Sequence, residues 1–390
     1  MRIDCHVHFT PPSLRDDFSH YEQTEPYWAL LAKPKSGKPG LQDWVTPEQM
    51  IADMDKAGID QVVLLGEPLA SHENCVERNN IALQLVNRYP ERIIAFAIIQ
   101  PLAGQKAIGE VKRCLDGGMR GLGEMGHYCG GYRFNSKEFL NVVEVCVQYQ
   151  VPINLHSNEE IGHFYFGKST IPLRDYYQLA CDVPELRIIM AHWGGGLFFY
   201  EMMPDVKKKL KNVFYDTAAS PLLYPTDQIF PIALQILDHH KILYGSDYPL
   251  RICPAKQKVA DFQPFLAEID DLKLDEEKIE DIFGKNFLRL FSEIDDLNTD
   301  PVSITNKPTM QSKQPIINAA MIDEKMSVSF VAHNWPETQA VFNMYKIPWQ
   351  DQPVPVWEPI IQAMAAHGMD ETQREMMINE LNEAIQHGIN

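Results

Sequence analysis

Eight short runs rich in Val, Ile and Leu recur between residues 1 and 247, and helical patterns separate them. Their near-continuous hydrophobicity is typical of parallel strands covered by helices. The runs are Met1–Thr10, Gln61–Gly66, Ile93–Gln100, Met119–Met125, Val151–Ser157, Leu186–Trp193, Asn212–Thr217 and Lys241–Asp247. Eight strand–helix units favour an α/β fold of the closed (β/α)8 TIM-barrel type over an open doubly wound sheet. No G-x-G-x-x-G motif follows a strand, which removes a dinucleotide-binding alternative.

Helical spacing fills the intervals between the strands. Thr46 is expected to cap a helix that ends at Gly58. Another helix is expected at Asn79–Tyr89, and the last barrel helix at Asp275–Phe291, where apolar residues recur on one face. One long segment, Pro11–Val45, interrupts this order after the first strand. A loop there lies on the catalytic face of a barrel, so it is either a lid or substrate wall, or a plain cover for the barrel end.

The composition changes after residue 291. Ser292–Lys325 is rich in Asp, Asn, Thr, Ser and Pro, which predicts a linker. Apolar periodicity returns from Met326 onward and indicates a small all-α domain. We therefore expect a barrel over residues 1–291, a linker over 292–325 and a helical domain over 326–390 that serves protein contacts or oligomerisation.

Composition and charge exclude several classes of partner. The formal charge of −18 argues against a nucleic-acid partner, because phosphate binding needs clustered Lys and Arg. No run of 18 apolar residues and no signal pattern is present, so we expect neither a membrane span nor export. Seven scattered cysteines without a C-x-x-C motif are typical of reduced thiols in a cytoplasmic protein.

Metal-ligating residue types stand at the ends of five of the eight strands. His6 and His8 alternate on one side of the first strand, with Cβ atoms roughly 7 Å apart, so both rings can reach one cation. The other strand ends carry Glu124, His156, His192 and Asp247. Barrel enzymes gather their functional groups at these ends, so the pattern predicts a metal site there.

The residue types also indicate roles. His6, His8, His156 and Asp247 suit Zn²⁺ and also accept Mn²⁺ or Fe²⁺. Asp247 can in addition serve as the general base for a metal-bound water. We expect His192 to contact a substrate carbonyl or to move a proton, with a role as a further ligand or support as the alternative.

Glu124 is open to three interpretations: a bridging ligand, a ligand to a second metal, or a group that orients His156. The fourth strand ends without a lysine that could bridge two ions, so a site with one metal is favoured. Lys168 and Arg251, in loops after the fifth and eighth strands, are candidates for holding an anionic substrate group, or else form rim salt bridges. Trp193 either stacks on a flat substrate or packs under a loop.

Five motifs carry a resemblance to a known family: IDCHVHF, GLGEMG, INLHSNE, IIMAHWGGG and LYGSDYPL. In this order they resemble the amidohydrolase superfamily, and in particular the amidohydrolase-related branch that includes carboxymuconate-semialdehyde decarboxylases. The resemblance implies a TIM barrel in which His6, His8, His156 and Asp247 hold a divalent metal, usually zinc, and His192 is the catalytic acid–base. It also admits a homodimer, since dimers are common in that branch. The glutamate of GLGEMG is shared with TatD-type nucleases, but the net charge weighs against DNA as substrate.

The tail carries a looser resemblance. MSVSFVAHNWPETQAVFNMYKI is similar to small helical domains of iron–sulfur repair proteins. Those relatives continue into a cysteine pair, whereas this chain continues as PWQDQPV. Without the thiols we do not expect redox or di-iron chemistry, and we interpret His333 and His367 as structural.

The sequence thus predicts, first, a metal-dependent hydrolase that uses metal-bound hydroxide on a small, anionic substrate. The alternative is a non-oxidative, metal-dependent decarboxylase of an unsaturated or aromatic acid, because the branch contains both kinds of enzyme. A second alternative is a non-catalytic scaffold, which the complete set of His and Asp positions disfavours.

Overall fold

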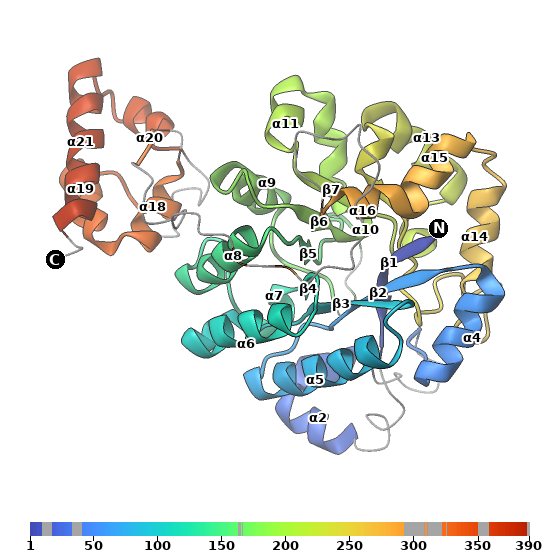
Figure 1. The fold of residues 1–390 in the computed structure, drawn as a ribbon. Coiled ribbons are helices and arrows are strands. Elements are labelled where there is room, and N and C mark those ends of the chain that lie inside the picture. The colour runs from blue at the N-terminus through green and yellow to red at the C-terminus, as the bar shows by residue number, and fades with distance from the viewer. Residues whose placement is uncertain are drawn as a thin grey trace.

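A computed structural model describes residues 1–9, 18–32, 41–162, 165, 167–291, 308, 310, 322–324, 326–349 and 359–387. Eight parallel strands form one sheet whose spatial order equals their order in the chain. They are β1 (Ile3–His8), β2 (Gln61–Leu65), β3 (Ile93–Ala97), β4 (Gly121–Met125), β5 (Ile153–Leu155), β6 (Ile188–Met190), β7 (Val213–Asp216) and β8 (Ile242–Leu243). The predicted TIM barrel is confirmed (Figure 1).

The segment after β8 closes the barrel against β1. Val7 and Tyr248 form a parallel bridge, and the amide of His8 donates to the carbonyl of Tyr248 at 2.7 Å. Further down the seam, the amide of Cys5 donates to the carbonyl of Tyr244 at 2.8 Å. The eighth strand itself is only two residues long, so the barrel is closed by hydrogen bonds between β1 and the residues that follow β8.

Helices surround the barrel (Figure 1). The main ones are α4 (Pro47–Ala57), α5 (His72–Arg88), α6 (Gln105–Asp116), α8 (Lys137–Tyr149), α9 (Leu173–Asp182), α11 (Pro204–Lys209), α13 (Thr226–Ile236), α14 (Gln263–Asp270), α15 (Glu276–Glu280) and α16 (Asn286–Arg289). Shorter elements lie in the loops: α2 (Phe18–Thr24), α3 (Pro26–Ala32), α7 (His127–Gly130), α10 (Ala191–Gly194), α12 (Ser220–Leu223), and the 3₁₀ turns η1 (Pro101–Ala103), η2 (Leu197–Met202) and η3 (His239–Lys241).

Helix boundaries follow local capping. In α4, the Thr46 side chain accepts a hydrogen bond from the amide of Gln49, and Gly58 ends the helix at φ +68°, both as expected. The prediction of a helix start at Asn79 was wrong, because Ser71 caps α5 eight residues earlier, by accepting from the amide of Asn74. The last barrel helix is also not continuous: a π-helical turn, η4 (Asp281–Lys285), separates α15 from α16.

Helices also form the C-terminal part of the chain: α18 (Val328–Asn334), α19 (Gln339–Met344), α20 (Ile360–Ala366) and α21 (Glu371–His387), with the 3₁₀ turn η5 (Pro336–Thr338). They pack on one another through buried side chains such as Val331, Phe342 and Met364. In Figure 1 they lie beside α8 and α9, and Asn135 Nδ2 donates to Ser329 Oγ at 3.3 Å. Most of the predicted linker at 292–325 lies outside the described residues. In the described part of the chain, no helix is long and apolar enough to cross a membrane.

A buried ion pair lies beneath β7 and β8. Lys241 Nζ is 2.5 and 2.6 Å from the two carboxylate oxygens of Glu201 and donates to the carbonyl of Leu210 at 3.0 Å. Tyr215 donates its hydroxyl to the same carboxylate at 2.7 Å. Glu201 is 2% exposed and Lys241 9%. Each charge is therefore shielded from water and is compensated by the other.

We expect Lys241→Met to destabilise the barrel by about 3–5 kcal/mol, because it leaves the Glu201 charge buried without its partner. The double variant Lys241→Met/Glu201→Gln should recover most of this loss. Urea denaturation followed by circular dichroism measures both effects. A loss of less than about 1 kcal/mol in the single variant would show that the pair does not stabilise the fold.

Candidate metal centre

The predicted side chains from β1 and from the segment after β8 meet at the C-terminal end of the barrel. His6 and His8 bring their Nε2 atoms within 3.1 Å of each other. Asp247 Oδ1 lies 3.8 Å from the first of these nitrogens and 3.4 Å from the second. Glu124 Oε2 approaches the same two atoms at 3.9 and 3.7 Å.

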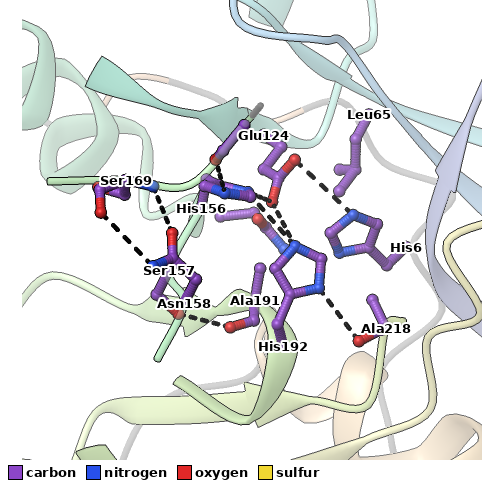
Figure 2. Close-up of polar contacts among 12 residues, drawn as sticks. His6, Leu65, Glu124, His156, Ser157, Asn158, Ser169, Ala191, His192 and Ala218 are labelled. Atoms are coloured by element: carbon purple, nitrogen blue, oxygen red, sulfur yellow. Dashed lines mark hydrogen bonds and ion pairs between the residues drawn. The ribbon is translucent and has the colours of Figure 1, made fainter. Parts of the chain in front are cut away.

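The other oxygen of Glu124 faces the remaining two histidines. Glu124 Oε1 is 2.8 Å from His156 Nδ1 and 3.3 Å from His192 Nε2, and these nitrogens are 3.3 Å apart. Figure 2 shows the Glu124 carboxylate among the rings of His6, His156 and His192. The structure therefore brings all six predicted residues into one cluster, with Glu124 as the link between its halves.

Each of the four imidazoles is anchored through the ring nitrogen that faces away from the cluster. The acceptors are Asp216 Oδ2 for His6 (2.8 Å), Leu65 O for His8 (3.3 Å), Gly167 O for His156 (2.8 Å) and Ala218 O for His192 (3.1 Å). Because a carbonyl or carboxylate can only accept, the anchoring nitrogen carries the hydrogen and the other one presents a lone pair. This is the arrangement that metal-ligating histidines adopt in proteins.

A cation fits this donor set. Four imidazole lone pairs and the carboxylates of Glu124 and Asp247 face one another at 2.8–3.9 Å, and all of these groups are acceptors. Contacts between acceptors are unfavourable unless positive charge lies among them. Nitrogen and oxygen ligands of this kind suit Zn²⁺ or Mn²⁺.

The local electrostatics agree with a need for positive charge. Burial opposes protonation of His6, but the charges of Asp216 and Glu124 outweigh it and raise the pKa of His6 to about 10. Burial likewise opposes a charge on Glu124, yet the neighbouring His156 and His6 hold the pKa of this carboxyl well below its usual range. The carboxylates thus attract protons or a metal ion into the cluster.

Backbone conformation places two of these side chains. Asp247 has φ +68° and His192 φ +58°, in the left-handed region that costs a non-glycine residue about 1–3 kcal/mol. Asp4 Oδ1 ties the strand ends together by accepting from the amides of His6 at 3.1 Å and Ser246 at 3.0 Å. The fold therefore holds Asp247 in a strained conformation where β1 meets the segment after β8, and His192 in another at the end of β6.

Asp216 is a site residue that the sequence analysis missed. It is fully buried at the end of β7, where Oδ2 accepts from His6 Nδ1 at 2.8 Å and Oδ1 from the amide of His192 at 2.9 Å. Asn154 Nδ2 also donates to Oδ2 at 3.2 Å. Its signal was present in the sequence, because Asp216 is the carboxylate at the end of the seventh apolar run, next to its last residue Thr217, much as Asp247 ends the eighth run.

The proposed substrate residues occupy different surroundings. Lys168 directly follows Gly167, the acceptor of His156 Nε2, and its Nζ is 3.1 Å from Glu159 Oε1. Arg251 is partly buried in the loop after β8, where its Nη1 donates to the carbonyl of Lys258 at 3.2 Å. Lys168 thus makes an ion pair, and its binding of a substrate stays a prediction.

The expected stacking of Trp193 on a substrate is not supported by its position. The ring is fully buried, packs edge-on against Phe230 with centroids 5.1 Å apart, and donates from Nε1 to Ser220 Oγ at 2.9 Å. Since its polar atom is already satisfied inside the protein, Trp193 belongs to the packing beneath the loop.

The described part of the Pro11–Val45 segment reaches the catalytic face. The hydroxyl of Tyr27, in α3, accepts a hydrogen bond from the amide of Gly167 at 3.2 Å. This places α3 against the loop that anchors His156. The location matches the expectation, and the role as a substrate wall stays a prediction.

The amidohydrolase family model matches residues 3–292. The chain belongs to the amidohydrolase family. Its fold resembles 5-carboxyvanillate decarboxylase from Sphingomonas paucimobilis, at 15% identity and a TM-score of 0.60 over 74% of this chain and 98% of that one. A 2,6-dihydroxybenzoate decarboxylase from Rhizobium gives 17% and 0.54 over 74% and 98%. A dihydroxybenzoic acid decarboxylase from Polaromonas, solved with manganese and the inhibitor 2-nitroresorcinol, gives 17% and 0.55 over 76% and 99%. At these identities the likeness establishes the barrel fold of this amidohydrolase-family chain.

We expect His6→Ala to lower the content of bound divalent metal by one ion per chain, because it removes a lone pair from this cluster. Asp216→Asn should keep the site but weaken its metal affinity about 10- to 100-fold. The neutral amide no longer supplies the negative charge that faces His6 Nδ1 and fixes the tautomer of that ring. Elemental analysis and titration with Zn²⁺ or Mn²⁺ measure these changes.

Asp271→Asn, at an exposed aspartate, is the matched control and should bind metal as the wild type does. Circular dichroism must show that every variant is folded. Unchanged metal content in His6→Ala would refute the site.

Proposed function

We propose that this chain is a metal-dependent carboxy-lyase that removes CO₂ non-oxidatively from an aromatic or unsaturated acid. The observation that carries the proposal is the fold likeness to named aromatic-acid decarboxylases over almost their whole length, combined with a cluster of four imidazoles and two carboxylates. This reverses the order of the sequence analysis, where hydrolysis came first and decarboxylation second.

In this proposal His6, His8, His156 and Asp247 hold the ion. The structural neighbours with bound manganese favour Mn²⁺ as a candidate beside Zn²⁺, and the mixed nitrogen and oxygen donors accept either. When bound, the ion neutralises the facing carboxylates and polarises an oxygen of the substrate. Glu124 contacts both halves of the cluster, at 2.8 Å from His156 and 3.9 Å from His6, and we propose it as a further ligand or as the group that orients His156.

His192 is the proposed acid–base residue. Decarboxylation breaks the carbon–carbon bond to the carboxylate, leaves its electron pair on the substrate carbon, and requires one proton to form the new C–H bond. His192 donates from Nδ1 to the carbonyl of Ala218, so its Nε2 faces the cluster and is free of the anchoring contact. Once solvent has protonated Nε2, His192 can deliver that proton to the carbon and is left with its Nε2 lone pair.

Lys168 and Arg251 remain the candidates for holding an anionic group of the substrate. Lys168 is the better placed, because it adjoins Gly167 and only 12% of its side chain is exposed. Its ion pair with Glu159 would have to rearrange around a bound acid.

Hydrolysis is the second candidate. Asp247 Oδ1 lies 3.4 Å from His8 Nε2 and 3.8 Å from His6 Nε2, where a carboxylate can take a proton from a nucleophilic water. The amidohydrolase family membership agrees with this chemistry as well.

Isotopes separate the two reactions. Metal-loaded enzyme is incubated with hydroxybenzoates, unsaturated acids, esters and lactones in D₂O or in H₂¹⁸O. Decarboxylation releases CO₂ and places one deuterium on the carbon that lost it, whereas hydrolysis places ¹⁸O in the product. We expect deuterium incorporation, and ¹⁸O incorporation without CO₂ would contradict the proposal.

His192→Asn should lower the turnover about 10²- to 10⁴-fold while metal content is retained, because general acid–base catalysis contributes on this scale. His333→Asn, in α18, is the control and should leave turnover unchanged. Metal-loaded protein without turnover on any of these substrates would favour the scaffold alternative.

We also propose the division into a barrel at 1–291, a linker at 292–325 and a helical domain at 326–390. Truncation after Phe291 should leave a soluble barrel that binds metal like the full chain. Light scattering of both forms then shows whether the helical domain mediates self-association. Aggregation of the fragment would show that the C-terminal helices are part of the barrel's core.

A further inference from the structure

A second group of metal-ligating side chains lies at the opposite end of the barrel. Asp238, His239 and His240 stand immediately before β8, whereas the first cluster follows the strands. Glu277 in α15 and Asp281 at the start of η4 pack against them. None of these residues belongs to the candidate metal centre.

Two imidazoles converge on one buried oxygen. Asp281 Oδ2 is 2.9 Å from His239 Nε2 and 3.2 Å from His240 Nε2. The two rings are tilted by 34° with centroids 4.2 Å apart, and both Nε2 atoms face Asp281. Asp281 is 2% exposed, and its other oxygen accepts from Arg289 Nη1 at 3.0 Å.

A second carboxylate orients the pair from the opposite side. Asp238 Oδ1 is 2.8 Å from His240 Nδ1 and 3.7 Å from His239 Nδ1. In the tautomer that donates to this carboxylate, His240 presents the Nε2 lone pair to Asp281. The Glu277 carboxylate has an oxygen within 4.8 Å of ligand atoms of His239 and Asp281.

We propose that these residues form a separate site for a divalent transition-metal ion of the Zn²⁺ class. His239 Nε2, His240 Nε2 and Asp281 Oδ2 are its ligands, and the exposed Glu277 carboxylate supplies a fourth. Two imidazoles and two carboxylates are a donor set that zinc accepts in tetrahedral geometry. The histidine side chains are 22% and 29% exposed, which leaves an entry path from solvent.

The neighbouring charges and backbone are compatible with such a site. Arg289 neutralises the far oxygen of Asp281 and leaves Oδ2 to the imidazoles. Asp281 opens the π-helical turn that interrupts the last barrel helix, and such turns occur frequently at functional sites. A bound ion would join the turn before β8 to the helices that follow it, and so would act as a structural clamp.

The test titrates Zn²⁺ into chelator-treated full-length protein in the His6→Ala/Asp247→Ala background, where the first centre is disabled. We expect this protein to bind one Zn²⁺ per chain during the titration, and its melting temperature to rise as the ion binds. Adding His239→Gln/His240→Gln should abolish both effects. Because the readout is stoichiometry and melting in an inactive background, it does not depend on the proposed function.

Two further variants keep the test decisive. Glu277→Gln changes an exposed residue, so it should fold normally and lower Zn²⁺ affinity about tenfold or more even if the histidine variant fails to fold. His367→Gln, at an exposed histidine of the C-terminal helices, should bind as the background does. Absence of Zn²⁺ in the background protein, or unchanged affinity in the folded histidine and Glu277 variants, would overturn the proposal.

Discussion

The seam between β1 and the segment after β8 is the constraint on which the site depends. The amide of Asp247 donates to the carbonyl of His6 at 2.9 Å, and Asp4 bridges the amides of His6 and Ser246. These bonds close the barrel and at the same time bring the first two candidate ligands, His6 and His8, to the last one, Asp247, more than 200 residues away. Barrel closure and site assembly are therefore one structural event.

The cost of this assembly is visible at the C-terminal end of the barrel, at Asp247 beside the seam and at His192 after β6. A buried cluster of acceptors is unfavourable by itself, and the left-handed backbone at Asp247 and His192 adds strain. Both terms must be offset by the packing and hydrogen bonding of the rest of the barrel. Asp216 is central here, because one buried carboxylate holds the ring of His6 and the backbone of His192 together.

Sequence periodicity was sufficient for the fold and for most of the cluster. The ends of the strands can be located from the sequence because each apolar run stops at a polar residue of metal-ligating type, as at His156 and Asp247. Asp216 was missed although it also stands at the end of an apolar run. It acts by accepting hydrogen bonds from His6 and from the amide of His192, and these contacts cannot be recognised from the sequence. For Trp193 the sequence left stacking on a substrate and packing under a loop open, and only the structure shows that its ring is fully buried.

Features that depend on tertiary contacts were beyond sequence reasoning. The early start of α5 is not such a feature, since it follows from the local cap at Ser71, but the π-helical turn inside the last barrel helix has no periodic signal. Lys168 shows the same limit, because only the fold reveals that Glu159 lies 3.1 Å away.

The short eighth strand lies between the His239–His240 pair at one end of the barrel and Asp247 at the other. It has two strand residues, so its position is set by what holds its flanks. Below it, Asn286 Nδ2 donates to the carbonyls of His239 and Ile242, both at 2.8 Å, and the amide of Tyr244 donates to the carbonyl of Ile282 at 2.8 Å. The same helical segment thus supports β8 and carries Asp281, which contacts the histidine pair. Any interaction that tightens this lower contact also stabilises the strand that leads to Asp247, because only a few closely packed residues separate the two.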